Sequence, residues 1–324
     1  MRKRCEKQKT EVFAILKNIS SLLSPELIAA IYRLGHGDTV VLADRSFPAG
    51  SIAKEGGAKL ICADGHGIPG LLQEILKLML LDTYADKPVM LMDKLPCDAD
   101  MDIPIWEIYR SVISRHDRRK NRTIGYYERF EFYAQAKKAS CIIKTGETSG
   151  YANIILKAMG ARRLKTWSPD SPEDGIPAIM SAELAATLCE MGHGDTVVLG
   201  DGNFPAGSIA GAGGAKLIRA DGHGIPELLD AILFLMPLDT YEDTPVMLMD
   251  RLPCDANMPM PVWENYCRIV GGYDTRGRNA FAHCKRSAFY ERAKSAYCVV
   301  QTGEPSAYAN IILQKGAVKA ASHE

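Results

Sequence analysis

The sequence lacks an excess of charge of either sign, because 39 Lys and Arg residues balance 39 Asp and Glu residues. A balanced chain gives no electrostatic reason to expect a nucleic acid or an anionic membrane as partner. It also lacks any apolar run near the ~20 residues that a membrane-spanning helix needs. The basic N-terminal MRKRCEKQK is followed by no apolar stretch of the secretory kind. We therefore expect neither nucleic acid nor membrane as a partner.

Paired cysteines and metal-binding spacings are also lacking. The nine cysteines are an odd number and form no CxxC pair, which is typical of a chain in the reducing cytoplasm. No HxH, HExxH or cysteine-rich spacing accompanies the histidines, which disfavours a metal site. The glycines of GHGDT and KEGGAK do not follow a strand and open a helix in the pattern of a phosphate-binding loop. We expect no cofactor.

What the sequence does contain is a long internal repeat. GHGDTVVLAD at positions 35–44 returns as GHGDTVVLGD at 192–201, an offset of 157 residues that holds along the repeat without a gap. A period this long gives each copy enough chain for its own core, unlike the short periods of solenoids. We predict a first domain over residues 12–160, a polar, proline-bearing linker over 161–175 and a second domain over 176–318.

Within the first copy, helical and strand patterns alternate. Ser24 and Pro25 suit the start of a helix, as N-cap and first-turn residue. Alternating helices and strands predict an α/β fold, with two tandem three-layer α/β/α domains around a largely parallel or mixed sheet. Ligands in such sheets collect at loops beyond the strand ends. The predicted helices are 24–35, 68–81, 104–116 and 126–139, and the predicted strands are 39–43, 58–63, 88–92, 140–146 and 153–157.

Polar residues that recur in both copies are the candidates for chemistry. A histidine between two glycines suits proton transfer near neutral pH, although a histidine at a helix-to-strand turn can equally be structural. The helix at 126–139 keeps a cation and an aromatic pair where the copies otherwise differ, and here too core packing is an alternative. A Tyr-x-Asn pair before the last strand offers donors and acceptors suited to sugar hydroxyls, or simply turn chemistry. These candidates are His36/His193, Arg129/Arg286, Tyr133/Tyr290, Tyr151/Tyr308 and Asn153/Asn310, with Asp82/Asp239 and Asp64/Asp221 as acidic loop residues.

Six strings of the first copy, taken in order, carry a family resemblance: LSPELIAAIYRLGHGD, ADxxFPAGSI, ADGHGIPGLL, LDTY, RFEFY and TGExxxYANIIL. Together they resemble the fucose mutarotase branch of the family that also contains D-ribose pyranase, over roughly 19–160 and 176–318. The tandem fusion departs from that family, whose members are usually single-copy chains that assemble into rings. The first copy also reads FYAQAKKA where the family has FYERAK, and His66/His223 stand where an apolar residue is expected.

The resemblance implies a D-ribose pyranase-like fold and interconversion of the α and β anomers of L-fucose, and of related monosaccharides, without metal or nucleotide. It implies that an acid and a base act on two oxygens of one sugar, a contribution of roughly 10²–10⁴ in rate for each group. By the family match, His36 and His193 are proton donors, and Tyr133 and Tyr290 are the opposing acid/base groups. The residues implied to hold the sugar are Asp44/Asp201, Asp82/Asp239, Arg129/Arg286, Tyr151/Tyr308 and Asn153/Asn310.

The opening string sets a geometrical limit on such a site. Five strand residues at about 3.3 Å each place His36 and Asp44 roughly 17 Å or more apart if the run is straight. One monosaccharide cannot touch both, so either the chain folds back at one end or a pocket combines groups from neighbouring copies. We predict pockets built at interfaces, in a homo-oligomeric ring of fused pairs.

Two other functions remain open at this stage. A non-catalytic monosaccharide-binding protein on the same fold would use the histidines for binding alone. A metal-dependent hydrolase would use the His and Asp loops as ligands. Anomer exchange measured by NMR separates the mutarotase from the first alternative, and activity after chelation separates it from the second.

Overall fold

The computed structural model describes residues 16–170 and 175–318, so the predicted domain start at residue 12 and part of the predicted linker lie outside the described residues. Contacts divide the chain into two compact units. The first domain comprises Leu22–Thr166 with Glu173–Ala178, and the second comprises Ile179–Glu324 with Trp167–Pro172 and Met1–Ser21, each in its described part. Each domain thus includes the short segment that precedes the first helix of the other repeat.

These segments are attached by backbone pairing. In the first domain, β9 (Ile176–Pro177) pairs in parallel with β8 (Arg163–Leu164). In the second domain, the Lys17 amide donates to the carbonyl of Leu235 at 2.7 Å. The chain therefore passes between the two domains more than once, and neither domain is a single continuous segment of the sequence.

Helices and strands alternate through the first domain, as the sequence pattern predicts. The N-cap of the first helix is Ser24, whose side chain accepts a hydrogen bond from the Leu27 amide. The elements are α1 (Pro25–Arg33), β1 (Thr39–Ala43), α2 (Ala49–Gly56), β2 (Lys59–Ala63), α3 (Ile68–Leu78), β3 (Met79–Leu81), β4 (Val89–Met92), α4 (Pro104–His116), β5 (Ile124–Tyr127), α5 (Arg129–Ala136), β6 (Cys141–Thr145) and β7 (Ile154–Ala161), with short 3-10 turns at Pro96–Asp98 and Lys120–Thr123.

The strands of the first domain form one mixed sheet in the order β2-β6-β1-β7-β4-β5, with β3 also paired to β7. β1 is parallel to β6 but antiparallel to β7, and β7 is antiparallel to β4 as well. The end of β7 therefore lies at the same sheet edge as the start of β1. This reversal decides which loops meet at each edge.

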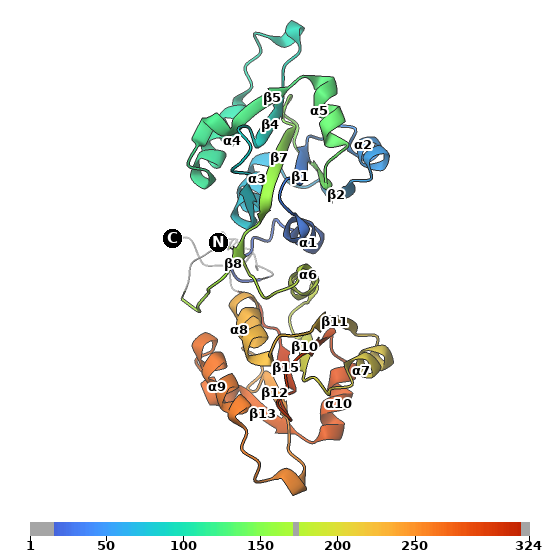
Figure 1. The fold of residues 1–324 in the computed structure, drawn as a ribbon, viewed down its shortest axis with the longest axis vertical. Coiled ribbons are helices and arrows are strands. Elements are labelled where there is room, and N and C mark those ends of the chain that lie inside the picture. The colour runs from blue at the N-terminus through green and yellow to red at the C-terminus, as the bar shows by residue number, and fades with distance from the viewer. Residues whose placement is uncertain (1–15, 171–174, 319–324) are drawn as a thin grey trace, which may run out of the picture. The chain divides into compact units, whose positions relative to one another are not determined.

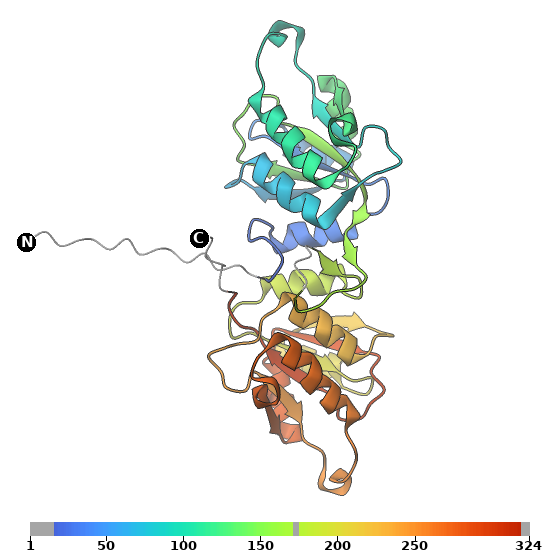
Figure 2. The same cartoon turned by 90° about the vertical axis from the view of Figure 1, so that its left-hand side faces the viewer.

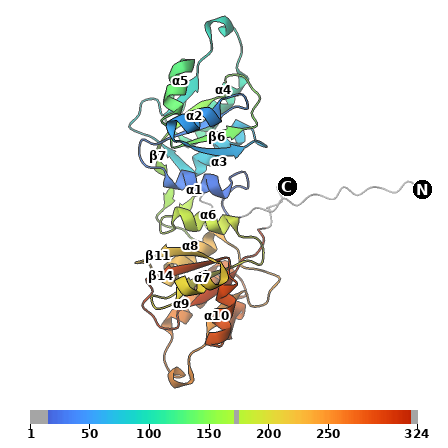
Figure 3. The same cartoon turned by 90° about the vertical axis from the view of Figure 1, so that its right-hand side faces the viewer.

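Helices cover both faces of this sheet, so the predicted three-layer α/β/α arrangement is confirmed. Figure 1 shows α3 and α4 on one side of the strands and α2 and α5 on the other, and Figure 2 and Figure 3 view these two helical layers in turn. Residues of β1 on both faces are buried, which agrees with its continuous apolar run. Its side chains therefore serve packing, and polar chemistry is confined to the loops at its two ends.

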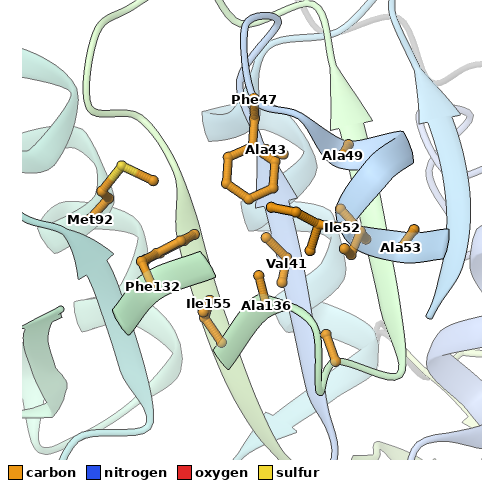
Figure 4. Packing of buried hydrophobic residues seen from close by; sticks show 12 residues of the cluster. Val41, Ala43, Phe47, Ala49, Ile52, Ala53, Met92, Phe132, Ala136 and Ile155 are labelled. Carbon is orange, nitrogen blue, oxygen red and sulfur yellow. The ribbon is translucent and has the colours of Figure 1, made fainter. Parts of the chain in front are cut away.

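The layer of α2 and α5 packs on the sheet through a compact apolar cluster. Phe47, just before α2, meets Phe132 of α5 edge-to-face with ring centroids 5.9 Å apart. Val41 and Ile155 contribute from the neighbouring strands β1 and β7, and Figure 4 shows these side chains converging between sheet and helices. Phe132 is a core residue, which agrees with core packing as one of the two interpretations of the aromatic pair on the helix predicted over 126–139.

Three local predictions differ from the structure. The helix expected over 126–139 begins only at Arg129, because residues 124–127 pair in parallel with β4 as β5 and Glu128 caps the helix. The helix expected over 68–81 ends at Leu78, since the last apolar residues form β3 against β7. The helix α2 had no predicted counterpart.

The second domain repeats this order of elements. Its sheet runs β11-β14-β10-β15-β12-β13, and a single bridge from Leu238 to Lys315 replaces β3, where Pro237 cannot donate to a ladder. None of the helices in the described ranges is long and apolar enough to cross a membrane. The elements are α6 (Ala182–Glu190), β10 (Thr196–Gly200), α7 (Ala206–Gly213), β11 (Lys216–Ala220), α8 (Ile225–Leu235), β12 (Val246–Met249), α9 (Pro261–Tyr273), β13 (Phe281–Cys284), α10 (Arg286–Lys294), β14 (Cys298–Thr302) and β15 (Ile311–Gln314), with 3-10 turns at Pro253–Asp255 and Gly277–Ala280.

One buried cation distinguishes the second domain. Lys315 is 2% exposed and donates to the carbonyls of Leu188 and Met191 at 2.7 and 2.6 Å, at the negative end of α6. Its counterpart in the first repeat is Ala158. Burial lowers the pKa of Lys315 to about 8.

Gly56→Ala should destabilise the first domain although alanine is the better helix former. A Cβ at Gly56, the last residue of α2, would lie 1.8 Å from the backbone oxygen of Lys137. Such overpacking typically costs about 1–3 kcal/mol, which urea unfolding measures. The matched control is Gly50→Ala in the same helix, where a Cβ meets nothing within 4 Å and no loss is expected. Equal stability of the two variants would contradict this account of the α2–α5 contact.

Lys315 should make the stability of the second domain depend on alkaline pH. An unfolded lysine titrates near 10.4, so between pH ~8 and ~10 the unfolded chain binds more protons and stability rises with pH. We expect the unfolding free energy to rise over this window by on the order of 1–3 kcal/mol relative to a Lys315→Met chain. Parallel pH profiles for the two chains would show that Lys315 titrates at its ordinary value.

Candidate functional site

The candidate residues of each domain divide between two edges of its sheet. By edge we mean here the end of the sheet at which its strands begin or end, not an outermost strand. The histidine edge is the start of β1 with the end of β7, and the tyrosine edge is the end of β1 with the start of β7. His36 precedes β1 and Asp44 follows it, and no chain reversal brings them together because β1 is a regular strand paired on both sides. The second domain has the same division along β10 and β15.

At the histidine edge, an exposed imidazole lies against a buried carboxylate. His36 Nε2 is 3.3 Å from Asp82 Oδ1, with the side chains 55% and 2% exposed. Asp82 directly follows β3, and its amide donates to the Lys157 carbonyl of β7 at 2.9 Å. The ring of Tyr84 lies 5.5 Å from the imidazole. An imidazole fixed in this way through one nitrogen presents its other nitrogen, Nδ1, for proton transfer.

The Asp82 carboxylate is held ionised by its surroundings. It accepts hydrogen bonds from the amides of Tyr84 and Ala85 at 2.8 and 3.3 Å, and Lys157 Nζ lies 3.4 Å away. Burial alone would raise the pKa of Asp82, but these hydrogen bonds together with that to His36 lower it below its usual range. The Arg119 guanidinium fixes the same loop by donating to the Asp82 carbonyl at 2.9 Å.

The second repeat builds the same pair with one difference. His193 Nε2 lies 3.1 Å from Asp239 Oδ1, and Arg276 donates to the Asp239 carbonyl at 2.7 Å. The second carboxylate oxygen accepts from Gln314 at 3.0 Å, where the first repeat has a lysine. Burial alone would raise the pKa of Asp239, but the hydrogen bonds to its carboxylate outweigh burial and lower that pKa. Both repeats thus hold an imidazole against a carboxylate that stays ionised at neutral pH.

At the tyrosine edge, Asp44 and Asn153 form a reciprocal pair. The Asn153 side chain accepts from the Asp44 amide at 2.9 Å and donates to the Asp44 carboxylate at 2.5 Å. Asp201 and Asn310 make the same two bonds at 2.9 and 2.8 Å. All four residues are buried. Burial raises the pKa of Asp201, partly offset by hydrogen bonds from Asn203 and Asn310.

The tyrosines of α5 and α10 lie half-buried beside this pair. Arg129 Nε donates to the Tyr133 hydroxyl at 3.2 Å, and Arg286 makes the same bond to Tyr290 at 2.9 Å. The Tyr133 ring also packs on Phe47, in the loop that follows Asp44, with centroids 5.5 Å apart. The arginine therefore fixes the position of the phenol oxygen in both repeats.

The turn that precedes β7 is tightly anchored. Tyr151 has the left-handed φ of 57°, its hydroxyl donates to Asp98, and its carbonyl accepts from the indole of Trp106 at 2.9 Å. The hydrogen bond to Asp98 raises the pKa of Tyr151. The fully buried Tyr109 donates to the next carbonyl, that of Ala152, at 2.8 Å. Trp106 and Tyr109 therefore position this turn from the core.

The second repeat anchors its turn in the same way. Tyr308 has φ 58°, and its hydroxyl donates to Asp255 at 2.5 Å, which raises the pKa of Tyr308. Trp263 donates to the Tyr308 carbonyl at 2.9 Å. A left-handed backbone at a tyrosine costs free energy, and it is retained at the same turn of both repeats.

The structure groups most predicted site residues at the tyrosine edge and separates them from the histidines. Asp82 and Asp239, which the resemblance associates with the sugar hydroxyls, lie with the histidines. His66 and His223 lie on the loops that follow β2 and β11, at the tyrosine edge, where their carbonyls accept hydrogen bonds from the Gly146 and Gly303 amides at 2.9 and 3.0 Å. Within the described residues, no group of three or more His, Cys, Asp or Glu side chains is arranged to hold a metal ion.

Sequence reasoning missed the residues that position the candidates. The repeat contained a signal for some of them, because LDTY and LPCDA recur unchanged in both copies. No local pattern connects an arginine near position 119 to an aspartate near position 82, since only the fold brings them together. The missed residues are Tyr84/Tyr241, Asp98/Asp255, Arg119/Arg276 and Lys157/Gln314.

Comparison with known proteins matches one repeat at a time. The chain is similar to fucose mutarotase of Homo sapiens (49% identical over 144 residues) and of Bos taurus (47% over 145 residues), each alignment covering 44% of this chain and 92% of the relative. It is also similar to a solved fucose mutarotase from Streptococcus pneumoniae in complex with L-fucose, with 48% identity, a TM-score of 0.41 and coverage of 44% of this chain and 96% of that one. The model of the RbsD / FucU transport protein family matches residues 17–160 and 174–318. The chain therefore belongs to the RbsD / FucU family, as two tandem members in one polypeptide.

Proposed function

We propose that the chain is an L-fucose mutarotase, an isomerase that interconverts the α and β anomers of L-fucose and of related monosaccharides. The proposal is supported by the similarity of a stretch about one repeat long to proteins named fucose mutarotase, and by the match of the family model to both repeats. The observation that carries the chemistry is the pairing, in both repeats, of an exposed imidazole with a buried ionised aspartate. This is an arrangement that orients a proton-transferring histidine.

Mutarotation needs two proton transfers on one hemiacetal. In the proposed mechanism, the side chain of His36 or His193 donates a proton to the ring oxygen while the side chain of Tyr133 or Tyr290 takes the proton of the anomeric hydroxyl. The C1–O5 bond breaks and C1 becomes an aldehyde. Rotation about C1–C2 presents the other carbonyl face, and the reverse transfers close the ring with the anomeric centre inverted. Each positioned group contributes roughly 10²–10⁴ in rate.

The remaining polar residues bind and orient. At the tyrosine edge, Asp44/Asn153 and their counterparts Asp201/Asn310 offer acceptors and donors to the sugar hydroxyls, with Tyr151 and Tyr308 beside them. Arg129 and Arg286 donate to the phenol oxygen and hold it in place. Asp82 and Asp239 act through the imidazole, because their carboxylates face it from the buried side. No step requires a metal or a cofactor.

We further propose that each pocket combines the histidine edge of one repeat with the tyrosine edge of another, in a homo-oligomeric ring of fused pairs. The support is the length of β1, which separates the two edges within a domain by roughly 17 Å or more. The free thiols of the eight described cysteines are compatible with the proposed cytoplasmic location.

The chain should accelerate anomer exchange of L-fucose, and His36→Ala with His193→Ala should abolish most of that acceleration. Loss of the proton donor lowers the rate by about 10²–10⁴, measured by NMR saturation transfer between the anomers. The single variants report whether both histidines work. The comparison variant is His66→Ala with His223→Ala, which removes two histidines that the proposed mechanism does not use.

Three outcomes would overturn parts of this assignment. An unmodified chain that binds fucose without exceeding the buffer rate would be a sugar-binding protein instead. Full exchange by the His36/His193 double variant would remove the assigned proton donor. Activity that disappears after chelation would favour a metal-dependent mechanism.

Separated variants test whether a pocket draws on two repeats. A chain with both histidines replaced by alanine and a chain with Tyr133 and Tyr290 replaced by phenylalanine should each be inactive alone. If the pocket joins repeats of different chains, co-assembly of the two should restore exchange. If it joins the two repeats of one chain, a chain with His36→Ala and Tyr290→Phe should be active by itself. Failure of both restorations would place each pocket within one repeat.

A further inference from the structure

The two repeats differ where the proposed acid/base tyrosine is presented. The first turn of α5 reads RFEFY (129–133), and that of α10 reads RSAFY (286–290). The arginine, the second phenylalanine and the tyrosine are shared. Phe130 of the first repeat is replaced by Ser287 in the second, so an aromatic ring is exchanged for a hydroxyl three residues before the tyrosine.

Phe130 is exposed although it is a large apolar side chain. It is 74% exposed, whereas Phe132 two residues later is fully buried in the core. Its ring meets the Tyr133 ring edge-to-face, with centroids 6.5 Å apart and planes at 90°. Phe130 therefore extends the Tyr133 surface outward, and folding of the domain does not account for it.

An aromatic ring beside the phenol changes which sugar substituent is favoured there. L-Fucose and L-galactose differ only at C6, where the first has a methyl group and the second a hydroxymethyl group. Contact between a methyl group and a phenyl ring is favourable in free energy, because it removes apolar surface from water. A hydroxyl at the same place loses its hydrogen bonds to water without replacement. A serine supplies a donor and an acceptor instead.

We infer that Phe130 makes the Tyr133 sites selective for 6-deoxy sugars, while Ser287 lets the Tyr290 sites accept sugars with a C6 hydroxyl. The inference rests on the proposed function and refines it. The fused chain then holds two classes of site with different sugar preferences. Phe130 and Ser287 are specificity-determining residues, and the proton transfers remain with the tyrosines and histidines.

The experiment compares both sugars at one class of site. Tyr290→Phe leaves only the Tyr133 sites active, and Tyr133→Phe leaves only the Tyr290 sites. In the Tyr290→Phe chain we expect kcat/KM to favour L-fucose over L-galactose by at least about tenfold more than in the Tyr133→Phe chain. Adding Phe130→Ser to the first chain should remove that difference, and adding Ser287→Phe to the second should create it.

The neighbouring position supplies the control. Glu131→Ala also introduces the residue of the second repeat, at an exposed position that contacts Gln135, and should leave the ratio unchanged. An equal loss for both sugars on Phe130→Ser would assign Phe130 a structural role and overturn the inference, as would an unchanged ratio.

A readout independent of turnover separates the inference from the proposed function. Saturation transfer from the protein to the C6 methyl protons of L-fucose should be strong in the Tyr290→Phe chain and weaken with Phe130→Ser. If the unmodified chain binds fucose without exchanging anomers, the proposed function fails while this measurement still decides the contact. An unchanged methyl signal would refute it.

Discussion

The antiparallel pairing of β7 with β1 is the constraint on which the site depends. It brings the end of β7 to the start of β1, so that Lys157 and the loop of Asp82 meet the histidine. It also brings the start of β7 to the end of β1, so that Asn153 meets Asp44. A strand running the other way would exchange these partners, so that Asp82 would lose Lys157 and Asp44 would lose Asn153. The two polar edges of each domain are thus consequences of one strand direction.

Much of the fold was predictable because local signals agreed with the final packing. The Ser24 cap, the β1 run and the α4 helix over Pro104–His116 follow the sequence pattern closely. The errors arose where an apolar or aromatic run suits two structures. Residues 126–127 and 79–81 were predicted as parts of helices, but each pairs with a neighbouring strand instead. Local periodicity carries no information on which strand will be a neighbour in the sheet.

The candidate site was predictable in its residues but not in its grouping. The repeat drew attention to the histidines, aspartates and tyrosines, although only Tyr133 and Tyr290 are kept where the surrounding residues differ. The aspartate of LDTY looked like a loop acid, and only the register of β3 on β7 shows that it faces the imidazole. The positioning groups, such as Arg119 and Trp106, act across more than thirty residues of chain, where no spacing rule applies.

Duplication has left the two repeats alike in their proposed chemistry and different around it. The imidazole–carboxylate pair and the arginine–phenol pair recur in both repeats. In contrast, Lys157 of the first repeat corresponds in sequence to Gln314 of the second, and Phe130 corresponds to Ser287. The central claim is that an imidazole and a phenol from separate sheet edges act on one hemiacetal. The most direct test is a crystal structure with L-fucose bound. The account predicts a histidine nitrogen and a tyrosine hydroxyl within hydrogen-bonding distance of O5 and O1 of the same sugar. A bound fucose that touches only one of these side chains would contradict it.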